Sequence, residues 1–326
     1  MINYKQQKGF NLVELLLALF VGLSLLLGVL SVFVGMRTTT KETSSYGQIQ
    51  ENGRFAISLI TDDLLRQGFW GDFTGKLDAS ALLTSPDPSN VSVSDCIGKG
   101  QNNASFPSTF GHFRTLWGET VQSNSTSNCI NNAKVDSDLI QLKRSISLPI
   151  APGNIISTRY YLIANPNSAA IFPGTQTIPS LSFAQIWEYQ HHLYYVREET
   201  QGSQKVPVLV QGRLQNKNPI MTLDMVVEGI EIIRFMYGVD SDNDGAVNAF
   251  ISADSMTSAF WDNENNTTIL AVKIFVLARD ILPDNKYINI NTYQLGDRQF
   301  IANDNYRRML FSTTVSLYNA RIDSWQ

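Results

Sequence analysis

Residues 12–36 read LVELLLALFVGLSLLLGVLSVFVGM, and this stretch decides the fold. From Leu15 to Met36 it holds 22 residues without a charge. As an α-helix these residues span roughly 33 Å, enough to cross a hydrocarbon core about 30 Å thick. The run is too long for the apolar region of a cleaved secretory signal peptide. The stretch therefore predicts a membrane-spanning helix.

A single carboxylate, Glu14, lies within the start of this apolar run. A charged side chain inside a bilayer costs a few kcal/mol on insertion scales, so the residue calls for an explanation. The segment before it, MINYKQQKG, is short and basic and ends in Gly9, directly ahead of Phe10. Two explanations fit: a partner of opposite charge, or a position near the interface from which the side chain reaches water.

The residues KGFNLVEL resemble the class III leader of type IV pilins and pseudopilins. The resemblance implies that a prepilin peptidase cuts between Gly9 and Phe10 and methylates the new amine of Phe10. Glu14 then becomes the fifth residue, which in this superfamily is thought to pair with the N-terminal amine of a neighbouring subunit. Such an ion pair is stronger in low dielectric than in water, although desolvation offsets part of the gain. Asn11 stands where threonine is usual.

The helical pattern continues beyond the apolar run in amphipathic form. Apolar or small residues recur at three- and four-residue steps: Tyr46, Ile49, Gly53, Ala56, Ile60 and Leu64. Gly68 is a suitable helix cap. We therefore expect one helix over residues 10–67, with a transmembrane half over 12–36 and a second half that packs on a globular head.

Residues 68–135 are rich in Ser, Asn, Gly and Pro, which predicts a long, loop-rich insertion. This insertion contains the two cysteines of the chain, Cys96 and Cys129. Their spacing does not fit a zinc site and no second pair exists, so we expect a disulfide, which requires an oxidising compartment.

From residue 136 to 326 the sequence predicts strands. Runs rich in Ile, Val, Tyr and Phe, several of them alternating as one-sided antiparallel strands do, are DLIQLKRSISL, STRYYLIA, QIWEYQHHLYYVREE, VPVLV, MVVEGIEIIRFMYGV, TILAVKIFVLAR and RRMLFSTTVSLYNAR. The predicted fold class is therefore α+β and pilin-like: a long N-terminal helix packed on an antiparallel β-rich head.

The same C-terminal runs, together with QENGRFAISLITDDLLRQGFW, resemble the PilW family of minor pilins. The resemblance implies a subunit of the pilus tip that helps to prime assembly and supports twitching motility and adhesion. Its partners would be the prepilin peptidase, other minor pilins, the major pilin, a tip adhesin and inner-membrane lipid. Its head would lie in the periplasm before assembly and at the cell surface afterwards. The order of these runs also resembles the J-type pseudopilin of type II secretion, which is the alternative.

Motifs of common enzyme classes are missing from the sequence, so we expect no catalytic activity. His191 and His192 are adjacent in a predicted strand, where their side chains point to opposite faces and cannot jointly hold a metal. The net charge of −4 shows no excess of basic residues of the kind that binds nucleic acid, so we expect no nucleic-acid partner. A membrane-anchored enzyme or an independent ligand-binding adhesin is a third class, for which no constellation is visible.

One motif carries chemistry: Asp240, Asp242 and Asp244 alternate ahead of Gly245, as in the first half of a calcium loop. The carbonyl of Ala246 and a water on Asn248 could add ligands. The twelfth position is Ile251 and not a bidentate glutamate, so Asp254 or another loop would have to complete the shell. An acidic hairpin turn without calcium fits the same residues.

Overall fold

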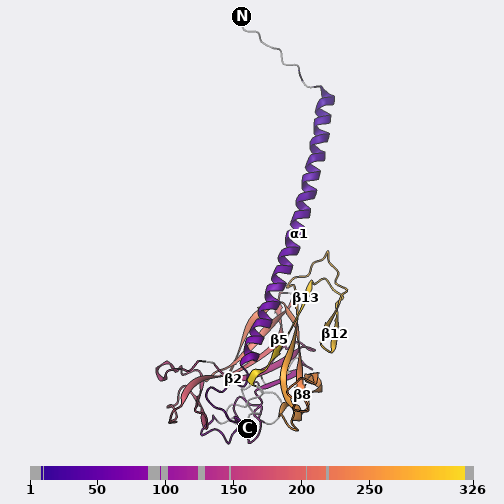
Figure 1. Cartoon of the computed structure of the whole chain (residues 1–326). Helices are drawn as coiled ribbons and strands as arrows, with labels where there is room; N and C mark the ends of the chain where they lie inside the picture. The colour runs from indigo at the N-terminus through magenta and orange to yellow at the C-terminus, as the bar shows by residue number, and fades with distance from the viewer. Residues whose placement is uncertain are drawn as a thin grey trace. The chain divides into compact units, whose positions relative to one another are not determined.

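A computed structural model describes residues 9, 11–86, 96, 102–123, 129–146, 148–202, 204–217 and 220–319. The chain divides into two compact units, Met1–Gln48 and Ile49–Gln326. One continuous helix, α1 (Leu12–Arg66), begins in the first unit and ends in the second (Figure 1). All described strands belong to the second unit.

The second unit contains a seven-stranded sheet, a four-stranded sheet and a two-stranded hairpin, with antiparallel pairing between all their strands. The seven-stranded sheet has the order β1 (Leu116–Thr120), β2 (Asp138–Ser145), β5 (Gln185–Gln201), β3 (Tyr160–Ala164) and β4 (Ala169–Pro173), with β6 (Gln204–Leu214) on β5 and β7 (Met221–Glu228) on β6. The four-stranded sheet has the order β13 (Arg308–Ser316), β10 (Thr268–Arg279), β8 (Ile230–Asp240) and β9 (Ala249–Ser252). The hairpin is β11 (Thr292–Leu295) and β12 (Arg298–Ile301); short helices are η1 (Pro152–Asn154), η2 (Ala253–Ser255) and α3 (Ser258–Trp261).

The central strands are apolar because both of their faces are covered. On β10, Val272 and Ile274 belong to the main core, whereas Phe275 points into a second cluster with Leu295 of the β11–β12 hairpin. Successive side chains of a strand alternate between faces, so only a strand covered on both sides buries such a run.

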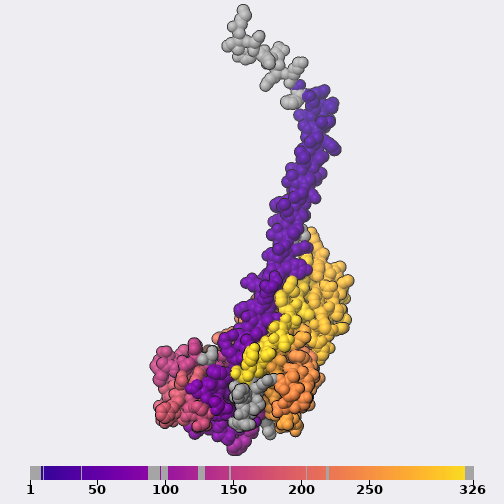
Figure 2. Space-filling model, viewed as in Figure 1, coloured from indigo at the N-terminus to yellow at the C-terminus, as the bar shows by residue number. Residues whose placement is uncertain are grey.

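The second half of α1 shares the main core with both sheets. Its buried residues Ile49, Ala56, Ile60 and Leu64 fall on one face at helical spacing and join Tyr194 of β5 and Val276 of β10 in one cluster. Gly53 lies on this face, and a Cβ there would stand 2.2 Å from the ring of Phe311 on β13. In the space-filling view the yellow C-terminal residues lie along this purple half of the helix (Figure 2).

The structure confirms the α+β, pilin-like fold, with two differences from the sequence prediction. The run MVVEGIEIIRFMYGV is not one strand, because Gly229 breaks it with a φ of +81° between β7 and β8. Its N–H donates to the carbonyl of Pro207, and a Cβ would lie 2.7 Å from the carbonyl oxygen of Arg279. The segment predicted as loop contains β1 and also Trp70, Phe73, Phe106 and Phe113, which form a second core against β3 and β5.

Candidate functional site

The first turn of α1 is closed by Glu14. Its Oε2 accepts the backbone N–H of Asn11 at 3.2 Å, and the backbone N–H of Leu15 donates to the carbonyl of Asn11 at 3.2 Å. A glutamate three residues after the N-cap that reaches back to the N-cap amide is half of a capping box. Glu14 therefore stabilises the start of the helix within its own chain.

The apolar first half of α1 is exposed. Its large side chains, such as Leu12 at 73% and Phe20 at 72%, lie open to the surroundings, and the most apolar 18-residue window is 0% buried. By length and composition, α1 is a helix that could cross a membrane. Exposed side chains of this kind are stable only in lipid or against another apolar surface.

Of the two residues at the predicted cleavage site, the structure describes only Gly9. Gly9 is exposed, and a Cβ built on it would have no atom within 4 Å, so the fold itself does not require glycine there. Phe10, the predicted first residue after cleavage and the predicted methylation site, lies outside the described residues. Cleavage and methylation stay predictions.

A second acidic residue of α1, Asp63, fixes the helix to the seven-stranded sheet. Arg144 of β2 donates from Nε to Asp63 Oδ1 at 2.9 Å, His192 Nδ1 of β5 lies 2.5 Å from Oδ2, and the hydroxyl of Tyr194 donates to the same oxygen. Asp63 is 3% exposed. Burial raises its pKa, but the hydrogen bonds and charges of His192, Arg144 and Tyr194 outweigh burial, so the pKa lies below its ordinary value.

Sequence reasoning missed Asp63, although a signal was present. Asp63 falls three residues after Ile60 and seven after Ala56, on the apolar face of the helix. A carboxylate on such a face predicts buried partners, because an unpaired buried charge is costly. Its neighbour Asp62 lies on the exposed side and pairs with Arg66 one turn later.

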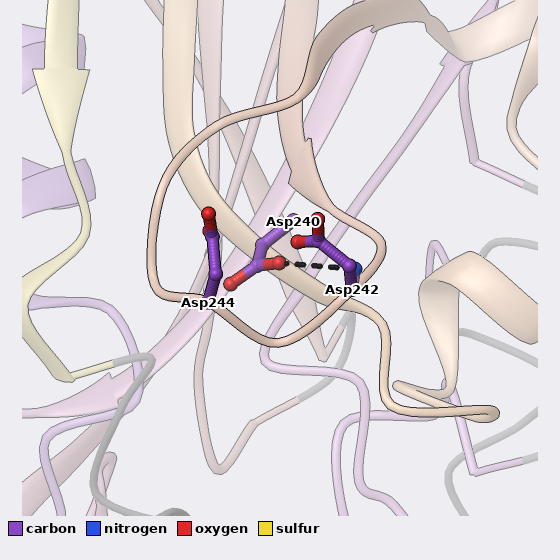
Figure 3. Close-up of side chains that lie close together, drawn as sticks. All are labelled: Asp240, Asp242 and Asp244. Atoms are coloured by element: carbon purple, nitrogen blue, oxygen red, sulfur yellow. Dashed lines mark hydrogen bonds between the residues drawn. The ribbon is translucent and has the colours of Figure 1, made fainter.

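The structure brings the three aspartates of the predicted calcium turn together. One carboxylate oxygen from each of Asp240, Asp242 and Asp244 lies within 4.8 Å of the others, around the loop between β8 and β9 (Figure 3). Asp240 is the buried member, whereas Asp242 and Asp244 are exposed. Three carboxylates this close repel one another unless a cation or a set of donors compensates them.

Backbone donors already compensate Asp240. Its Oδ1 accepts the N–H groups of Asn243 at 2.8 Å and Asp242 at 3.3 Å, and its Oδ2 accepts that of Gly245 at 2.8 Å. Burial raises the pKa of Asp240, but the hydrogen bonds from these backbone donors outweigh burial, so the pKa lies below its ordinary value. The turn is thus built as an Asx-type turn, and Asp240 is needed for its shape.

Two of the residues that could complete a calcium shell, Asp254 and Asn248, are otherwise engaged, and Ile251 offers no side-chain ligand. Asp254 accepts from the guanidinium groups of Arg234 at 3.1 Å and Arg298 at 3.0 Å. Ile251 pairs with Tyr237 in the ladder between β8 and β9, and Asn248 Oδ1 accepts the N–H of Ser241 at 2.6 Å. Calcium at this turn stays a prediction that rests on Asp242, Asp244, the carbonyl of Ala246 and solvent.

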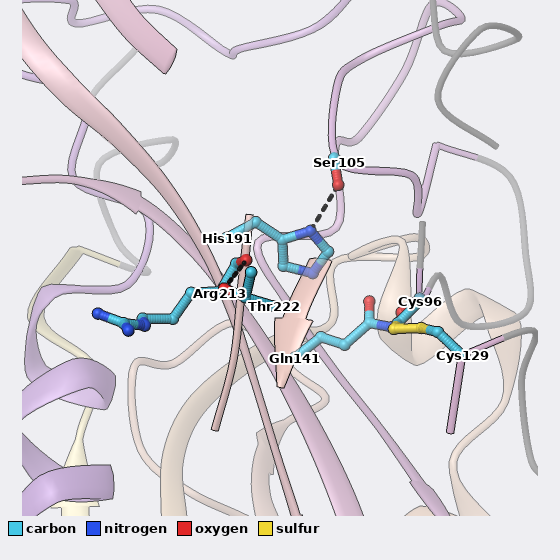
Figure 4. The surroundings of a disulfide bond; sticks show 7 residues. All are labelled: Cys96, Ser105, Cys129, Gln141, His191, Arg213 and Thr222. Atoms are coloured by element: carbon cyan, nitrogen blue, oxygen red, sulfur yellow. Dashed lines mark hydrogen bonds between the residues drawn. A yellow bond between two sulfur atoms is a disulfide. The ribbon is translucent and has the colours of Figure 1, made fainter. Parts of the chain in front are cut away.

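Cys96 and Cys129 form a disulfide, as the sequence predicts (Figure 4). Their Cα atoms are 5.5 Å apart, and Cys96 is fully buried in the main core. Gln141 of β2 donates from Nε2 to the carbonyl of Cys96 at 2.8 Å, which holds this part of the insertion against the sheet. Disulfides form and persist mainly in oxidising compartments.

The two histidines point to opposite sides of β5, and each has a structural contact. His192 meets Asp63, whereas His191 Nδ1 lies 2.8 Å from Ser105 Oγ (Figure 4). His191 is fully buried, and burial is the main cause that lowers its pKa well below the ordinary value. A buried neutral imidazole cannot meet a substrate, so this serine–histidine pair has no access for nucleophilic catalysis.

An exposed apolar helix that continues into the core of an antiparallel β-rich unit defines a type IV pilin-like protein. Residues 193–319, from within β5 to just past the end of β13, match the family model for type IV pilus-assembly protein W. The chain is therefore PilW-like and related to type IV pilus assembly. Comparisons with curated proteins and with solved structures gave no match.

Proposed function

We propose that the chain is a minor pilin that helps to prime assembly of a type IV pilus and forms part of its tip complex, where it supports twitching motility and adhesion. The precursor would span the inner membrane once, with its β-rich unit in the periplasm. After cleavage between Gly9 and Phe10, it would join other minor pilins, the major pilin and a tip adhesin in the pilus. The proposed role is structural and not enzymatic.

The continuity of α1 is the observation that supports this proposal best. One helix of 55 residues carries an apolar, exposed first half and a second half that is buried in the core with the strands. An exposed apolar segment of this kind is suited first to the bilayer and then to contacts with other subunits in a filament.

Deletion of the gene tests the proposal, with surface pili, twitching and protein secretion measured in parallel. We expect loss of surface pili and twitching with secretion intact, and rescue by the wild-type gene but not by Gly9→Val, because the peptidase needs a small residue before the cut. Loss of secretion with normal pili would instead identify a J-type pseudopilin. Mass spectrometry of the pilus-associated protein should find an N-methylated Phe10 as its first residue, and an intact Met1 would contradict the processing.

A further inference from the structure

A cleft of about 320 Å³ lies beside β1, the first strand of the seven-stranded sheet. One wall is formed by residues of β1, and the other by the segment that contains η2 and α3. Met256 and Trp261 belong to this second wall, and the ring of Trp261 lies 6.4 Å from that of Trp117 on β1. The cleft is therefore a bounded site between a strand and a short helical segment.

The cleft follows the edge of β1 and not one of its faces. Four successive residues line it: Trp117, Gly118, Glu119 and Thr120. Their side chains alternate between the two faces of the sheet, because successive residues of a strand point in opposite directions. One cleft can touch all four only along the outer edge of the strand, where the backbone is presented.

Within the part of the chain that the structure describes, the backbone groups on this edge have no partner strand. Val121 donates its N–H to Ser137 at 2.9 Å, and Thr115 accepts the N–H of Lys143 at 2.8 Å, so odd-numbered residues bond to β2. In antiparallel pairing the intervening residues point their N–H and C=O groups the other way, which places those of Gly118 and Thr120 on the cleft. Among the described residues, none pairs with this edge or hydrogen-bonds to these groups.

We propose that this cleft binds an extended segment of another pilus subunit, which pairs with the edge of β1 as an added antiparallel or parallel strand. Unpaired strand edges are templates for such pairing, and main-chain hydrogen bonds supply the affinity. Met256, which is half-buried and lines the cleft, would contact a side chain of the incoming segment. The proposal rests on the proposed function, because the partner is another subunit of the same pilus.

Site-specific photo-crosslinking in cells that assemble the pilus tests which chain enters the cleft. Ser258 is exposed and lines the cleft, whereas Ser255, also exposed, does not, so p-benzoylphenylalanine is placed at one or the other position. We expect position 258 to cross-link another pilin-class subunit at least tenfold more than position 255, with the cross-link in an extended segment of that subunit. A cross-link to the same chain, or equal yields at the two positions, would overturn the proposal.

Hydrogen exchange tests the pairing itself in the full-length chain in detergent, alone and with the subunit that the cross-link identifies. The amides of Gly118 and Thr120 should gain at least tenfold protection in the complex. The exchange rates of the amides of Trp117 and Glu119, which already bond to β2, should change less than twofold.

A pair of variants controls this measurement. Ser258→Trp, which fills the cleft, should abolish the gain in protection at Gly118 and Thr120, and Ser255→Trp should keep it. Unchanged exchange at Gly118 and Thr120 in the wild-type complex refutes strand addition, even where gene deletion shows that the chain is needed for piliation.

Discussion

Glu14 and Asp63 are two acidic residues on one helix, and they differ in where their partners come from. Asp63 is buried and meets Arg144, His192 and Tyr194, all supplied by strands of its own chain. Glu14 lies exposed at the first turn, where it accepts the amide of Asn11. The second half of α1 is therefore stabilised by strands of its own chain, whereas the large apolar side chains of the first half are exposed.

The largest effect is expected for Asp63→Asn. Loss of this charge leaves Arg144 buried without its anion, and breaking a buried ion pair costs about 3–5 kcal/mol. The matched control is the adjacent Asp62→Asn, whose ion pair with Arg66 is exposed and contributes at most about 0.5 kcal/mol. Denaturant unfolding of the full-length chain in detergent measures both, and equal effects would show that Asp63 is not a specific anchor.

Acid unfolding sharpens the same comparison. A carboxylate whose pKa is lowered by folding stabilises the fold above its unfolded-state pKa of about 3.9, and this stabilisation is lost as pH falls through the folded-state pKa. The wild-type protein should therefore lose stability steeply below about pH 4. In Asp63→Asn the free energy of unfolding should depend less steeply on pH in this acidic range. In Asp62→Asn the dependence should stay as in the wild-type protein. If the free energy of unfolding fell equally steeply with pH in all three proteins, the acid sensitivity would come from other carboxylates.

Gly53→Ala tests the close contact between the second half of α1 and β13. The added methyl overlaps the ring of Phe311, and overpacking of this kind costs about 1–3 kcal/mol. Gly47→Ala is the control in the same helix, because a Cβ there meets no atom within 4 Å. That change should stabilise the helix by up to about 1 kcal/mol. Thermal unfolding measures both, and a stabilising Gly53→Ala would mean that the ring moves aside freely.

Glu14→Leu tests the first half of the helix. Membrane insertion should stay intact or improve, because a charge leaves the apolar span. Incorporation into pili should fall about tenfold, equivalent to about 1.4 kcal/mol, if a neighbouring amine loses its partner. Quantitative immunoblots of sheared pili and of membranes measure the two steps.

Glu14→Gln separates the charge from the helix cap. Glutamine can still accept the amide of Asn11 in a capping box but carries no charge. It should therefore behave like Glu14→Leu in assembly if the ion pair matters. Normal incorporation of Glu14→Gln, with loss for Glu14→Leu, would assign the role of Glu14 to the cap alone.

The smallest effect is expected for calcium at the turn that follows β8. An incomplete shell predicts a Kd of about 10⁻⁴–10⁻³ M, so 1 mM calcium should stabilise the fold by about 0.4–1.4 kcal/mol. Asp242→Asn combined with Asp244→Asn should abolish this gain and keep the turn, because Asp240 still holds it. A thermal melt that does not move in 10 mM calcium would leave an acidic hairpin turn.

Much of the fold could be predicted because its signals are local. The amphipathic spacing of Ile49, Ala56, Ile60 and Leu64 predicts the buried helix face, and the nearly continuous apolar run of β10 predicts a strand. β9 and the β11–β12 hairpin could not be found in this way. Their four-residue strands are short and partly exposed, so no periodic pattern builds up. In the sequence, Gly229 is the one residue that indicates where β7 ends and β8 begins.

The sequence by itself determined the apolar span of α1, the pilin-like order of helix and strands, the disulfide cysteines and the acidic turn, because each depends on neighbouring residues or on composition. Only the tertiary structure decided which acid of the pair Asp62 and Asp63 is an anchor, since the partners of Asp63 come from 81 and 129 residues away. It also decided that the outer edge of β1 faces a cleft. Strand order depends on long-range packing, and no local pattern encodes which strand lies at the edge of a sheet among the described residues.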